Sequence, residues 1–338
     1  MPDRLPIHEI ADAIESSLSA PIRNRIVVAA PTGSGKSTQL PQIVLDRGLA
    51  GERKIVMLQP RRIAARMLAR RIAAERGSKL GDEVGYQIRF ENRSSRATRI
   101  ELVTDGILLR RFLRNPHVPD TGVIVFDEFH ERGLESDLAL ALAIRLQESS
   151  RPDMKIVVMS ATLDTRTIAD YLETDKILES GSRTYPVETF YQPLRSGSRE
   201  EVWDAAARAF EKSRDALSDD GHALVFMPGA FEIRRTLEAI KRTKADKGFD
   251  VLPLYGDLPP DQQDAAIDPG PRQKVIVSTN VAETSLTIDG VRLVIDSGLA
   301  RIADFDSRRE LNTLTVQKIA RDSADQRSGR AGRTGPGS

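Results

Sequence analysis

A glycine-rich loop is the feature of this sequence with the clearest chemical use. It occupies residues 30–38 as APTGSGKST, after an apolar run and before a helical stretch. Glycines let the backbone curl so that its N–H groups point at a phosphate, and the helix N-terminus adds positive potential. A lysine and a hydroxyl at the end of such a loop neutralise the β/γ-phosphates and ligate Mg²⁺. The loop therefore predicts phosphate binding by Thr32, Gly33, Ser34, Gly35, Lys36, Ser37 and Thr38, with Ser37 on the metal.

An acidic pair follows farther along the chain, in VIVFDEFHER at residues 123–132. Four apolar residues place Asp127 and Glu128 at the carboxyl end of a strand, which faces the ligand in open α/β sheets. We assign Asp127 to Mg²⁺, through water, and Glu128 to the attacking water. Each motif alone has a plainer explanation, a chance glycine turn or a solvated acidic turn, but together they favour nucleotide hydrolysis. His130 is a metal ligand or a hydrogen-bond donor, or it is structural, as a lone histidine usually is.

A third candidate segment is QRSGRAGR, at residues 326–333. Arg327, Arg330 and Arg333 recur every three residues, and this spacing predicts that they line one helical face. Planar guanidinium groups bind γ-phosphate oxygens in a bidentate way, so these arginines are candidate arginine fingers. A solvated basic helix end is the alternative.

The elements that must position these residues follow from the hydrophobic pattern. Apolar runs alternate with helical stretches, which is typical of a parallel sheet with helices on both faces, a doubly wound α/β fold. Gly, Ser and Pro cluster near residue 180, and the same pattern then repeats. We therefore predict two α/β domains, 1–180 and 185–338. The predicted strands are 25–30, 54–59, 122–128, 155–161, 223–227, 250–255, 274–279 and 291–296, and the predicted helices include 61–76, 200–216, 231–244 and 260–267. Residues 301–316 form either a projecting hairpin or a pair of edge strands.

Composition narrows the function classes. The chain has 338 residues, no cysteine and a net charge of +1, which excludes disulfide scaffolds, thiolate zinc sites and a global basic field. It has no apolar run of about 18 residues and no signal-peptide pattern at its start, so we expect a cytoplasmic protein that does not span a membrane.

With these pieces in place, the chain closely resembles superfamily 2 helicases of the DEAH class, and its DEFHER form resembles the bacterial HrpB type. The resemblance covers essentially the whole chain. The segments in family order are APTGSGKST (motif I), QPRRIAA (Ia, 59–65), TDG (Ib, 104–106), DEFH (II, 127–130), SAT (III, 160–162), STNVAETSLTIDG (V, 278–290) and QRSGRAGR (VI). The last two are long and highly specific.

The resemblance implies a helicase core of two tandem RecA-like domains, with ATP in the cleft between them. It implies movement in the 3′→5′ direction on a single strand, which we expect to be RNA. Gln326 would position the attacking water, Arg330 and Arg333 would be the arginine fingers, and His130, Ser160 and Thr162 would relay nucleotide state. Arg61, Arg62, Thr104, Thr279 and Asn280 would contact the strand, together with Thr284; Thr284 and Asp289 would also face the nucleotide, and Arg71 would stack on its base.

Some positions depart from the family pattern. Phe129 replaces the alanine of DEAH, as in HrpB-type proteins. Ile267 stands where eukaryotic members stack an aromatic side chain on the base, and no Q-motif precedes Ala30. Arg71 is then the main stacking group, and other NTPs should be accepted besides ATP. Winged-helix and ratchet domains would follow motif VI, where this chain ends, so we expect strand separation to depend on them.

The nucleic-acid side also has support from the residues alone. Residues 59–72 hold five arginines and no acid, and Arg61 and Arg62 directly follow a strand. One explanation for these arginines is contact with the phosphates of a nucleic acid, and the other is that they only keep the protein surface soluble. Aromatic residues are sparse, so a stacking platform is disfavoured, Trp203 is assigned to the core, and binding should track the backbone and weaken with salt.

Three rival functions remain at this stage. A double-strand translocase would share motifs I, II and VI. A nucleotide-gated clamp with little turnover is opposed by the presence of Glu128, Gln326, Arg330 and Arg333. A small-molecule kinase is opposed by motifs V and VI.

Overall fold

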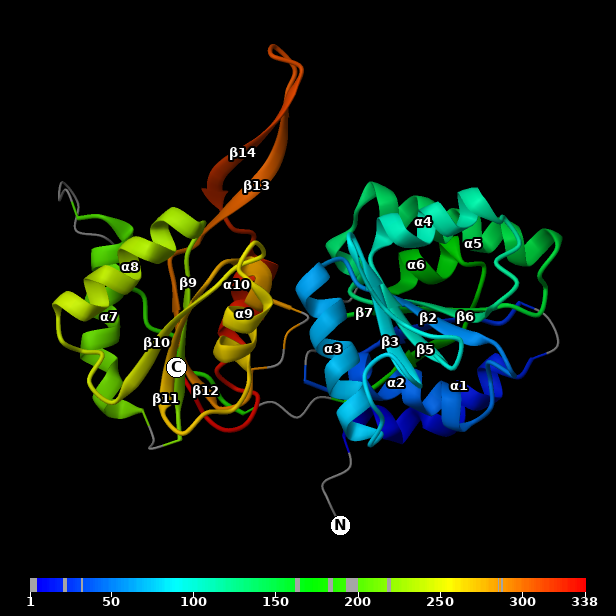
Figure 1. Ribbon diagram of the computed structural model, residues 1–338, viewed down its shortest axis with the longest axis horizontal. Helices are drawn as coiled ribbons and strands as arrows, with labels where there is room; N and C mark the ends of the chain where they lie inside the picture. Colours follow the sequence, from blue (N-terminus) through cyan, green and yellow to red (C-terminus); the bar gives the residue numbers. More distant parts are fainter. Residues whose placement is uncertain are drawn as a thin grey trace. The chain divides into compact units, whose positions relative to one another are not determined.

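The chain forms two compact units, Met1–Arg183 and Thr184–Ser338 (Figure 1). The computed structural model describes residues 5–20, 23–31, 33–161, 165–181, 185–192, 200–217, 220–284, 286 and 288–338. Across these ranges, no helix is both long and apolar enough to cross a membrane.

The first unit is built on an eight-stranded sheet with the order β4-β3-β5-β2-β6-β7-β1-β8. Neighbouring strands are parallel except β3 and β4, which are antiparallel. The strands are β1 (Arg25–Ala29), β2 (Lys54–Leu58), β3 (Val84–Ile88), β4 (Glu91–Arg93), β5 (Ile100–Val103), β6 (Thr121–Phe126), β7 (Lys155–Ser160) and β8 (Ile177–Glu179). The helical segments are η1 (Pro6–Ile10), α1 (Ala11–Leu18), α2 (Lys36–Asp46), α3 (Arg62–Glu75), α4 (Asp105–Arg114), η2 (Phe129–Glu131), α5 (Leu134–Ser149) and α6 (Thr165–Tyr171).

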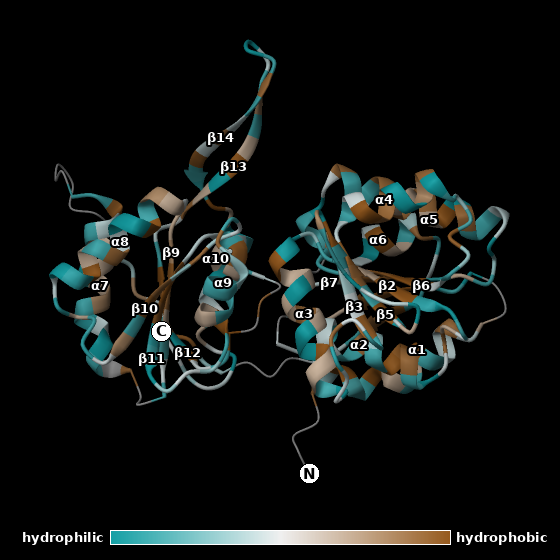
Figure 2. Cartoon of the chain, viewed as in Figure 1, coloured by the Kyte–Doolittle hydropathy of each residue, from teal (hydrophilic) through white to brown (hydrophobic). Residues whose placement is uncertain are grey.

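Two apolar cores lie on opposite faces of this sheet. One core joins α1, α2 and α3 to strand residues such as Val28, and the other joins α4, α5 and α6 to residues such as Val27. Successive strand residues point to opposite faces, so a strand buried on both sides must be apolar throughout. The strands accordingly form the brown interior of Figure 2. The doubly wound arrangement predicted from the sequence is present in this unit.

The second unit has a smaller parallel sheet with the order β10-β11-β9-β12. Its strands are β9 (His222–Phe226), β10 (Phe249–Leu254), β11 (Gln273–Ser278) and β12 (Val291–Asp296). Its helical segments are α7 (Val202–Ser213), η3 (Arg214–Ala216), α8 (Ala230–Arg242), α9 (Pro260–Ile267), η4 (Asn280–Ala282) and α10 (Arg321–Ser328). Phe210 and Phe249 meet edge to face in its core at 5.4 Å, and Trp203 packs against that core, as predicted.

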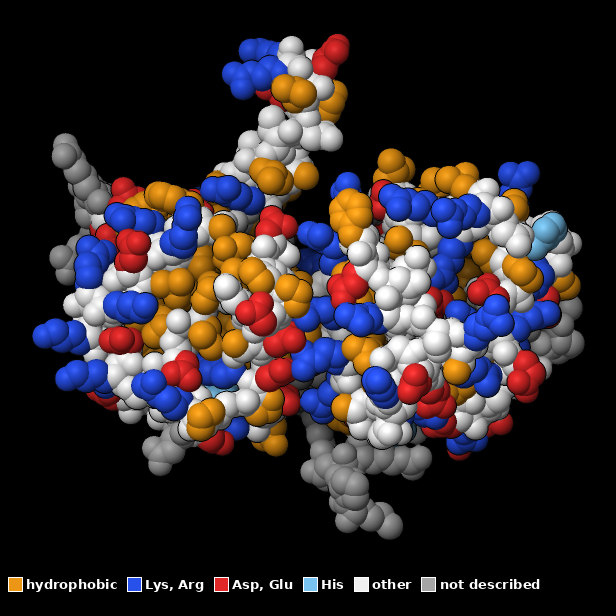
Figure 3. Space-filling model, in the orientation of Figure 1, with side chains coloured by type: hydrophobic (Ala, Val, Ile, Leu, Met, Phe, Trp, Pro, Cys, Tyr) orange, Lys and Arg blue, Asp and Glu red, His pale blue; other side chains and the backbone are white. Residues whose placement is uncertain are grey.

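A separate antiparallel hairpin extends from the second unit. It consists of β13 (Leu299–Asp306) and β14 (Leu311–Lys318), which pair with each other and not with the four-stranded sheet. Of the two interpretations left open by the sequence, the projecting hairpin is therefore the correct one (Figure 1). Its exposed surface carries apolar side chains, with basic ones gathered at the tip (Figure 3).

Candidate active site

The glycine loop of the first unit has the backbone that its sequence predicts. Gly33 and Gly35 have φ values of 88° and 87°, in the left-handed region that glycine enters without strain. A Cβ atom on Gly35 would also lie 2.8 Å from Leu5 Cδ1. Lys36 then begins α2. The loop conformation thus depends on these two glycines. Thr32 lies outside the described residues.

Buried polar atoms surround this loop. Lys36 is buried, and its Nζ lies 3.6 Å from Oε2 of Glu128, which is buried too. Ser34 is fully buried, and its Oγ has no hydrogen-bond partner among the described residues. An unpaired buried hydroxyl is unfavourable unless a ligand supplies a partner. Thr38 closes the turn by donating its Oγ1 hydrogen to the carbonyl of Gly35 at 3.3 Å.

The acidic pair lies where β6 ends, as predicted. Asp127 is buried and accepts hydrogen bonds from Gln59 Nε2 and from the Ser37 hydroxyl. Burial and the neighbouring charge of Glu128 raise the pKa of Asp127, while Lys36 and the two hydrogen bonds oppose this. The structure therefore brings Ser37 and Asp127 together as a pair of oxygen donors, the ligand type that Mg²⁺ prefers.

Glu128 adopts an unusual backbone conformation. Its φ is 49°, in the left-handed region, which costs a non-glycine residue roughly 1–2 kcal/mol. Its N–H donates to Asp127 Oδ1 at 2.9 Å, which ties the two carboxylates together through the backbone. Strain of this kind is typical of sites where side-chain direction matters. Here it directs the carboxylate toward Lys36 and His130.

His130 connects the acidic pair to the next strand end. Its Nδ1 accepts a hydrogen bond from the backbone N–H of Ala161 at 3.3 Å, directly after Ser160 at the end of β7. In the neutral imidazole the proton then lies on Nε2, which faces Glu128 Oε2 at 3.5 Å. His130 and Ser160, two of the predicted relay residues, therefore lie side by side. Thr162, the third, is outside the described residues.

The predicted strand-contacting residues of the first unit occupy helix starts. Arg61 is the N-cap of α3, exposed Arg62 begins that helix, and Thr104 is the N-cap of α4. Arg61 Nη2 pairs with Glu131 at 3.1 Å, an acidic partner that the sequence analysis missed. Any phosphate that Arg61 contacts must compete with this carboxylate.

Arg71, the predicted base-stacking residue, lies in the middle of α3. Its side chain is half exposed and pairs with Glu75 at 2.6 Å, one helical turn along.

The motif V segment of the second unit surrounds η4. Thr279 is the N-cap of η4 and accepts a hydrogen bond from Val281 N, and Asn280 is its first residue. Thr284 is buried, and Asp289 is exposed in the turn before β12.

The arrangement predicted for the motif VI arginines is wrong in one respect. Helix α10 ends at Ser328, so it includes Gln326 and Arg327 but neither Arg330 nor Arg333. The three arginines therefore do not line one helical face. The chain turns after Ser328 and passes so close to the segment after residue 184 that a Cβ on Gly332 would lie 2.6 Å from Tyr185 O.

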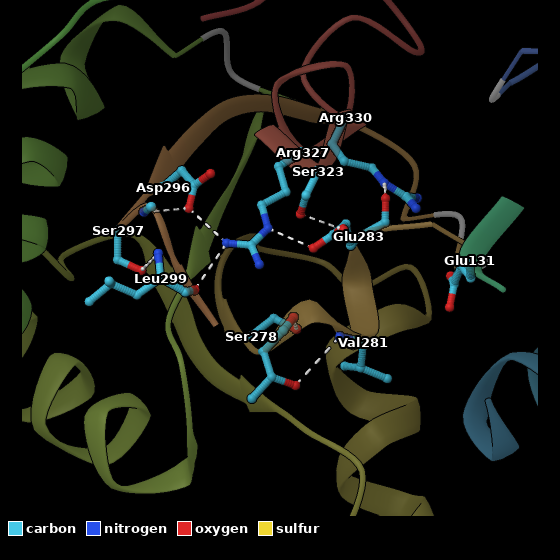
Figure 4. Close-up of polar contacts among 12 residues, drawn as sticks. Glu131, Ser278, Val281, Glu283, Asp296, Ser297, Leu299, Ser323, Arg327 and Arg330 are labelled. Atoms are coloured by element: carbon cyan, nitrogen blue, oxygen red, sulfur yellow. Dashed lines mark hydrogen bonds and ion pairs between the residues drawn. The ribbon is translucent and has the colours of Figure 1, made fainter. Parts of the chain in front are cut away.

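Backbone carbonyl groups of motif V hold the last two arginines. Arg330 is buried, and its Nε donates to the carbonyl of Glu283 at 2.8 Å (Figure 4). Its Nη1 donates to the carbonyl of Leu286. Arg333 Nη1 donates to the same Leu286 carbonyl at 3.3 Å. Motif V therefore fixes the direction of both guanidinium groups.

Comparisons with known proteins agree with this geometry. Residues 11–171 match the DEAD/DEAH box helicase model, and residues 208–335 match the helicase conserved C-terminal domain. The chain belongs to the DEAD/DEAH-box helicase family. It is 44% identical over 318 residues to the ATP-dependent RNA helicase HrpB of Escherichia coli K12, and 37% identical over 337 residues to the ATP-dependent RNA helicase HrpA of Borreliella burgdorferi.

The matches also define how much of such a helicase this chain represents. They cover 93% and 99% of this chain, but 38% and 40% of those two relatives. A crystal structure of the Escherichia coli DEAH/RHA helicase HrpB matches with a TM-score of 0.90 at 41% identity, over 98% of this chain and 42% of that one. The predicted fold class, two tandem RecA-like domains, is confirmed. The chain spans about two fifths of the length of these relatives and contains the regions that match the two helicase domain models.

The residues of this helicase core fit the nucleotide that the family uses. The left-handed glycines, the buried Lys36 and the unpaired Ser34 hydroxyl suit phosphate oxygens. Ser37 and Asp127 provide hard oxygen donors for a divalent cation.

Sequence reasoning also missed the role of a residue in the second unit. Glu283 of motif V uses its carbonyl for Arg330 and its carboxylate for Arg327, at 2.7 Å. No local spacing signals this role, because Arg327 lies 44 residues farther along the chain.

Proposed function

We propose that this chain is an ATP-driven motor core that moves along single-stranded RNA in the 3′→5′ direction. The observation that carries the proposal is the cluster in which Lys36, Glu128 and Asp127 lie buried together at the end of β6. Buried carboxylates at a strand end, beside a phosphate loop, suit hydrolysis of a bound nucleoside triphosphate. The choice of RNA follows the names of the similar helicases from Escherichia coli and Borreliella burgdorferi.

In this proposal the first unit binds the triphosphate and activates water. The loop N–H groups and Lys36 would bind the β- and γ-phosphates, and Ser37 and Asp127 would hold Mg²⁺, Asp127 through water. When bound, Mg²⁺ supplies charge neutralisation across the phosphate oxygens. Glu128 orients the attacking water and accepts its proton, and its left-handed backbone holds the carboxylate in place.

The second unit contributes the remaining polar groups in this proposal. Gln326 orients the same water, and Arg330 and Arg333 stabilise charge on the γ-phosphoryl group during transfer. Thr284 and Asp289 face the nucleotide, and Arg71 of the first unit stacks on its base. Without an aromatic stacking partner at Ile267, we expect NTPs other than ATP to be hydrolysed as well.

In this proposal, residues after the carboxyl ends of β6 and β7 transmit the change from bound ATP to ADP to the nucleic-acid strand. His130 links Glu128 to the backbone of Ala161, so a change at the γ-phosphate can move motif III. The strand contacts are Arg61, Arg62, Thr104, Thr279, Asn280 and Thr284. These side chains would contact the phosphates and sugars of the nucleic acid rather than its base edges, so binding should be tolerant of sequence and should weaken with salt.

The cytoplasmic location of the protein and the domain bounds 1–180 and 185–338 stay predictions.

The deciding experiment measures ATP hydrolysis with and without single-stranded RNA, and with DNA of the same sequence. Glu128→Gln is the blank, and exposed Glu173→Gln, an acid paired with Arg23, is the matched control. We expect turnover that rises with RNA and disappears only in Glu128→Gln. Translocation polarity is then measured by displacement of streptavidin from either biotinylated end of the strand. Nucleotide binding without turnover would instead support a clamp.

A further inference from the structure

One buried arginine joins three parts of the second unit. The Arg327 side chain, from α10, is only 1% exposed. Its Nε donates to Glu283 Oε2 at 2.7 Å, and its Nη1 donates to Asp296 Oδ1 at 2.8 Å and to the Leu299 carbonyl at 3.2 Å (Figure 4). Its guanidinium carbon also lies 4.8 Å from the ring centre of Phe226, at the end of β9. A guanidinium presents its donors in one rigid plane, so these partners are held in a fixed relative arrangement.

The first partner connects Arg327 to the proposed arginine finger. Glu283 receives Arg327 Nε and the Ser323 hydroxyl on its carboxylate, the latter at 2.6 Å. The backbone carbonyl of the same residue accepts Arg330 Nε at 2.8 Å. Because Glu283 is held through its side chain, its carbonyl has little freedom, and Arg330 is directed through it. Arg327 thus acts on the Arg330 guanidinium through Glu283, while the backbone N–H of Arg330 donates to the Arg327 carbonyl at 3.1 Å.

The other partners connect Arg327 to the base of the hairpin. Asp296 is the last residue of β12, and Leu299 is the first residue of β13. The turn between them is closed by Gly298 N, which donates to the same Asp296 Oδ1 at 2.9 Å. Ile319 N, just after β14, donates to the Gly298 carbonyl at 3.0 Å. Both ends of the hairpin therefore rest on the turn that Arg327 holds.

We propose that Arg327 is a positioning residue that holds the Arg330 side chain and the base of the β13–β14 hairpin as one rigid assembly. The expected effect on ATP hydrolysis rests on the proposed function. The expected effect on the rigidity of the hairpin base rests on the contacts of Arg327 alone. A movement imposed on Arg330 by a γ-phosphate would reach the hairpin through Glu283 and Arg327, with no rearrangement of the sheet. Lysine at position 327 keeps the charge but loses the planar donors, so it cannot serve all three acceptors in their present geometry.

The chain offers a closely matched control for Arg327→Lys. Arg25 of the first unit is also 1% exposed, and it also binds two side chains and one backbone carbonyl, those of Gln147, Glu148 and Leu172. It lies at the start of β1, away from motifs V and VI in the sequence. Both Arg25→Lys and Arg327→Lys remove a buried planar cation, so a loss of activity caused by general destabilisation would appear in both.

The kinetic experiment compares kcat and KM for ATP, with saturating single-stranded RNA, in the two lysine variants. We expect Arg327→Lys to lower kcat by about 10- to 100-fold, as misplacement of a group by about 1 Å can do, with KM changed less than about threefold. Arg25→Lys should keep kcat within about threefold. Because Arg327 acts through Arg330, adding Arg327→Lys to Arg330→Ala should cause little further loss. The proposal would be overturned if the two losses in kcat multiplied in the double variant, or if both lysine variants lost kcat equally.

Hydrogen exchange tests the structural half independently of turnover. Arg327→Lys should increase the exchange rates of the Gly298 and Ile319 amides by about tenfold or more, whereas Arg25→Lys should leave them unchanged. Unchanged exchange in Arg327→Lys would refute the rigid assembly of Arg330 and the hairpin base. If the wild-type chain hydrolyses no ATP, the proposed function fails, while this measurement still tests the rigid assembly. Should Arg327→Lys not fold, Glu283→Gln weakens the same link but keeps the carbonyl that Arg330 uses, and the same amides should respond.

Discussion

The two regions that carry the proposed chemistry hold their charged side chains in different ways. In the first unit, side chains face one another where β6 ends: Nζ of Lys36, the first residue of α2, lies 3.6 Å from the Glu128 carboxylate, beside buried Asp127. In the second unit, backbone carbonyls of motif V hold Arg330 and Arg333. The first region therefore depends on which side chains are present, and the second depends on the shape of the backbone. Substitutions in the first should act on chemistry directly, and some in the second should act through folding.

The largest effect is expected for Arg330→Ala. Loss of an arginine finger reduces phosphoryl transfer by about 10³- to 10⁵-fold, so we expect kcat to fall by at least about 10³ while ATP binding persists. The measurement is steady-state ATP hydrolysis with RNA, beside nucleotide affinity. Arg242→Ala, which removes an exposed arginine paired with Asp204 at 2.7 Å, should have no effect on kcat. A fall in kcat below about tenfold for Arg330→Ala would show that another residue stabilises the transferred phosphate.

Glu128→Gln should come next, with a loss of about 10²- to 10⁴-fold in kcat, the usual contribution of a general base. The amide keeps the size of the side chain but cannot accept the proton of water. Nucleotide affinity should stay the same or increase, because one negative charge near the phosphates is removed. Fluorescent-nucleotide titration and hydrolysis assays measure the two effects separately. A variant that retains more than about a tenth of wild-type turnover would remove Glu128 from the role of base.

The difference between the regions also explains what the sequence could predict. The acidic pair and the glycine loop were located correctly because each motif is contiguous and its chemistry depends on residue type. The Arg327 contacts could not be predicted, since its partners lie 44, 31 and 28 residues away and include a backbone carbonyl. The pairing of Arg61 with Glu131, 70 residues apart, was missed for the same reason.

The missed strands have a different cause. β5 has only four residues, β4 and β8 have three, and β3 contains glycine, so none gives a long apolar run. β8 lies inside the Gly-, Ser- and Pro-rich stretch that was predicted to be only a boundary, and it is fixed by pairing with β1. The end of α10 was misplaced because the regular spacing of arginines continues through Gly329 and Gly332, where the backbone turns. Tertiary pairing and close approach override local pattern in each case.

Gly332→Ala tests whether the second region depends on backbone shape. The added methyl group would lie 2.6 Å from the Tyr185 carbonyl oxygen, and the backbone there cannot move without breaking the Tyr185 N–H bond to the Gly332 carbonyl at 2.9 Å. We expect a loss of roughly 1–3 kcal/mol in unfolding free energy, typical of overpacking. Denaturant unfolding measures it. Gly256→Ala is the control, because nothing lies within 4 Å of the added Cβ and no positive φ is involved. Equal stability of the two variants would contradict the close approach.

The smallest effect, and the one with the opposite sign, is expected for Asp127→Asn. Burial and the charge of Glu128 raise the pKa of Asp127 above its usual value of 3.8. A carboxylate whose pKa is higher in the folded state stabilises folding only when protonated, and this contribution is lost as pH rises through the folded pKa. At pH 8 the nucleotide-free variant should therefore be more stable than wild type, by on the order of 1 kcal/mol, and the gap should narrow toward pH 5. Thermal unfolding of both proteins across that range, without nucleotide or Mg²⁺, measures this difference in stability.

A more stable Asp127→Asn would show that the acidic pair lowers the stability of the fold in return for its chemistry, as active sites often do. In the second unit, by contrast, Glu283→Gln should lower stability at the same pH. A less stable Asp127→Asn at pH 8 would mean that the hydrogen bonds from Gln59 and Ser37 outweigh the burial of charge.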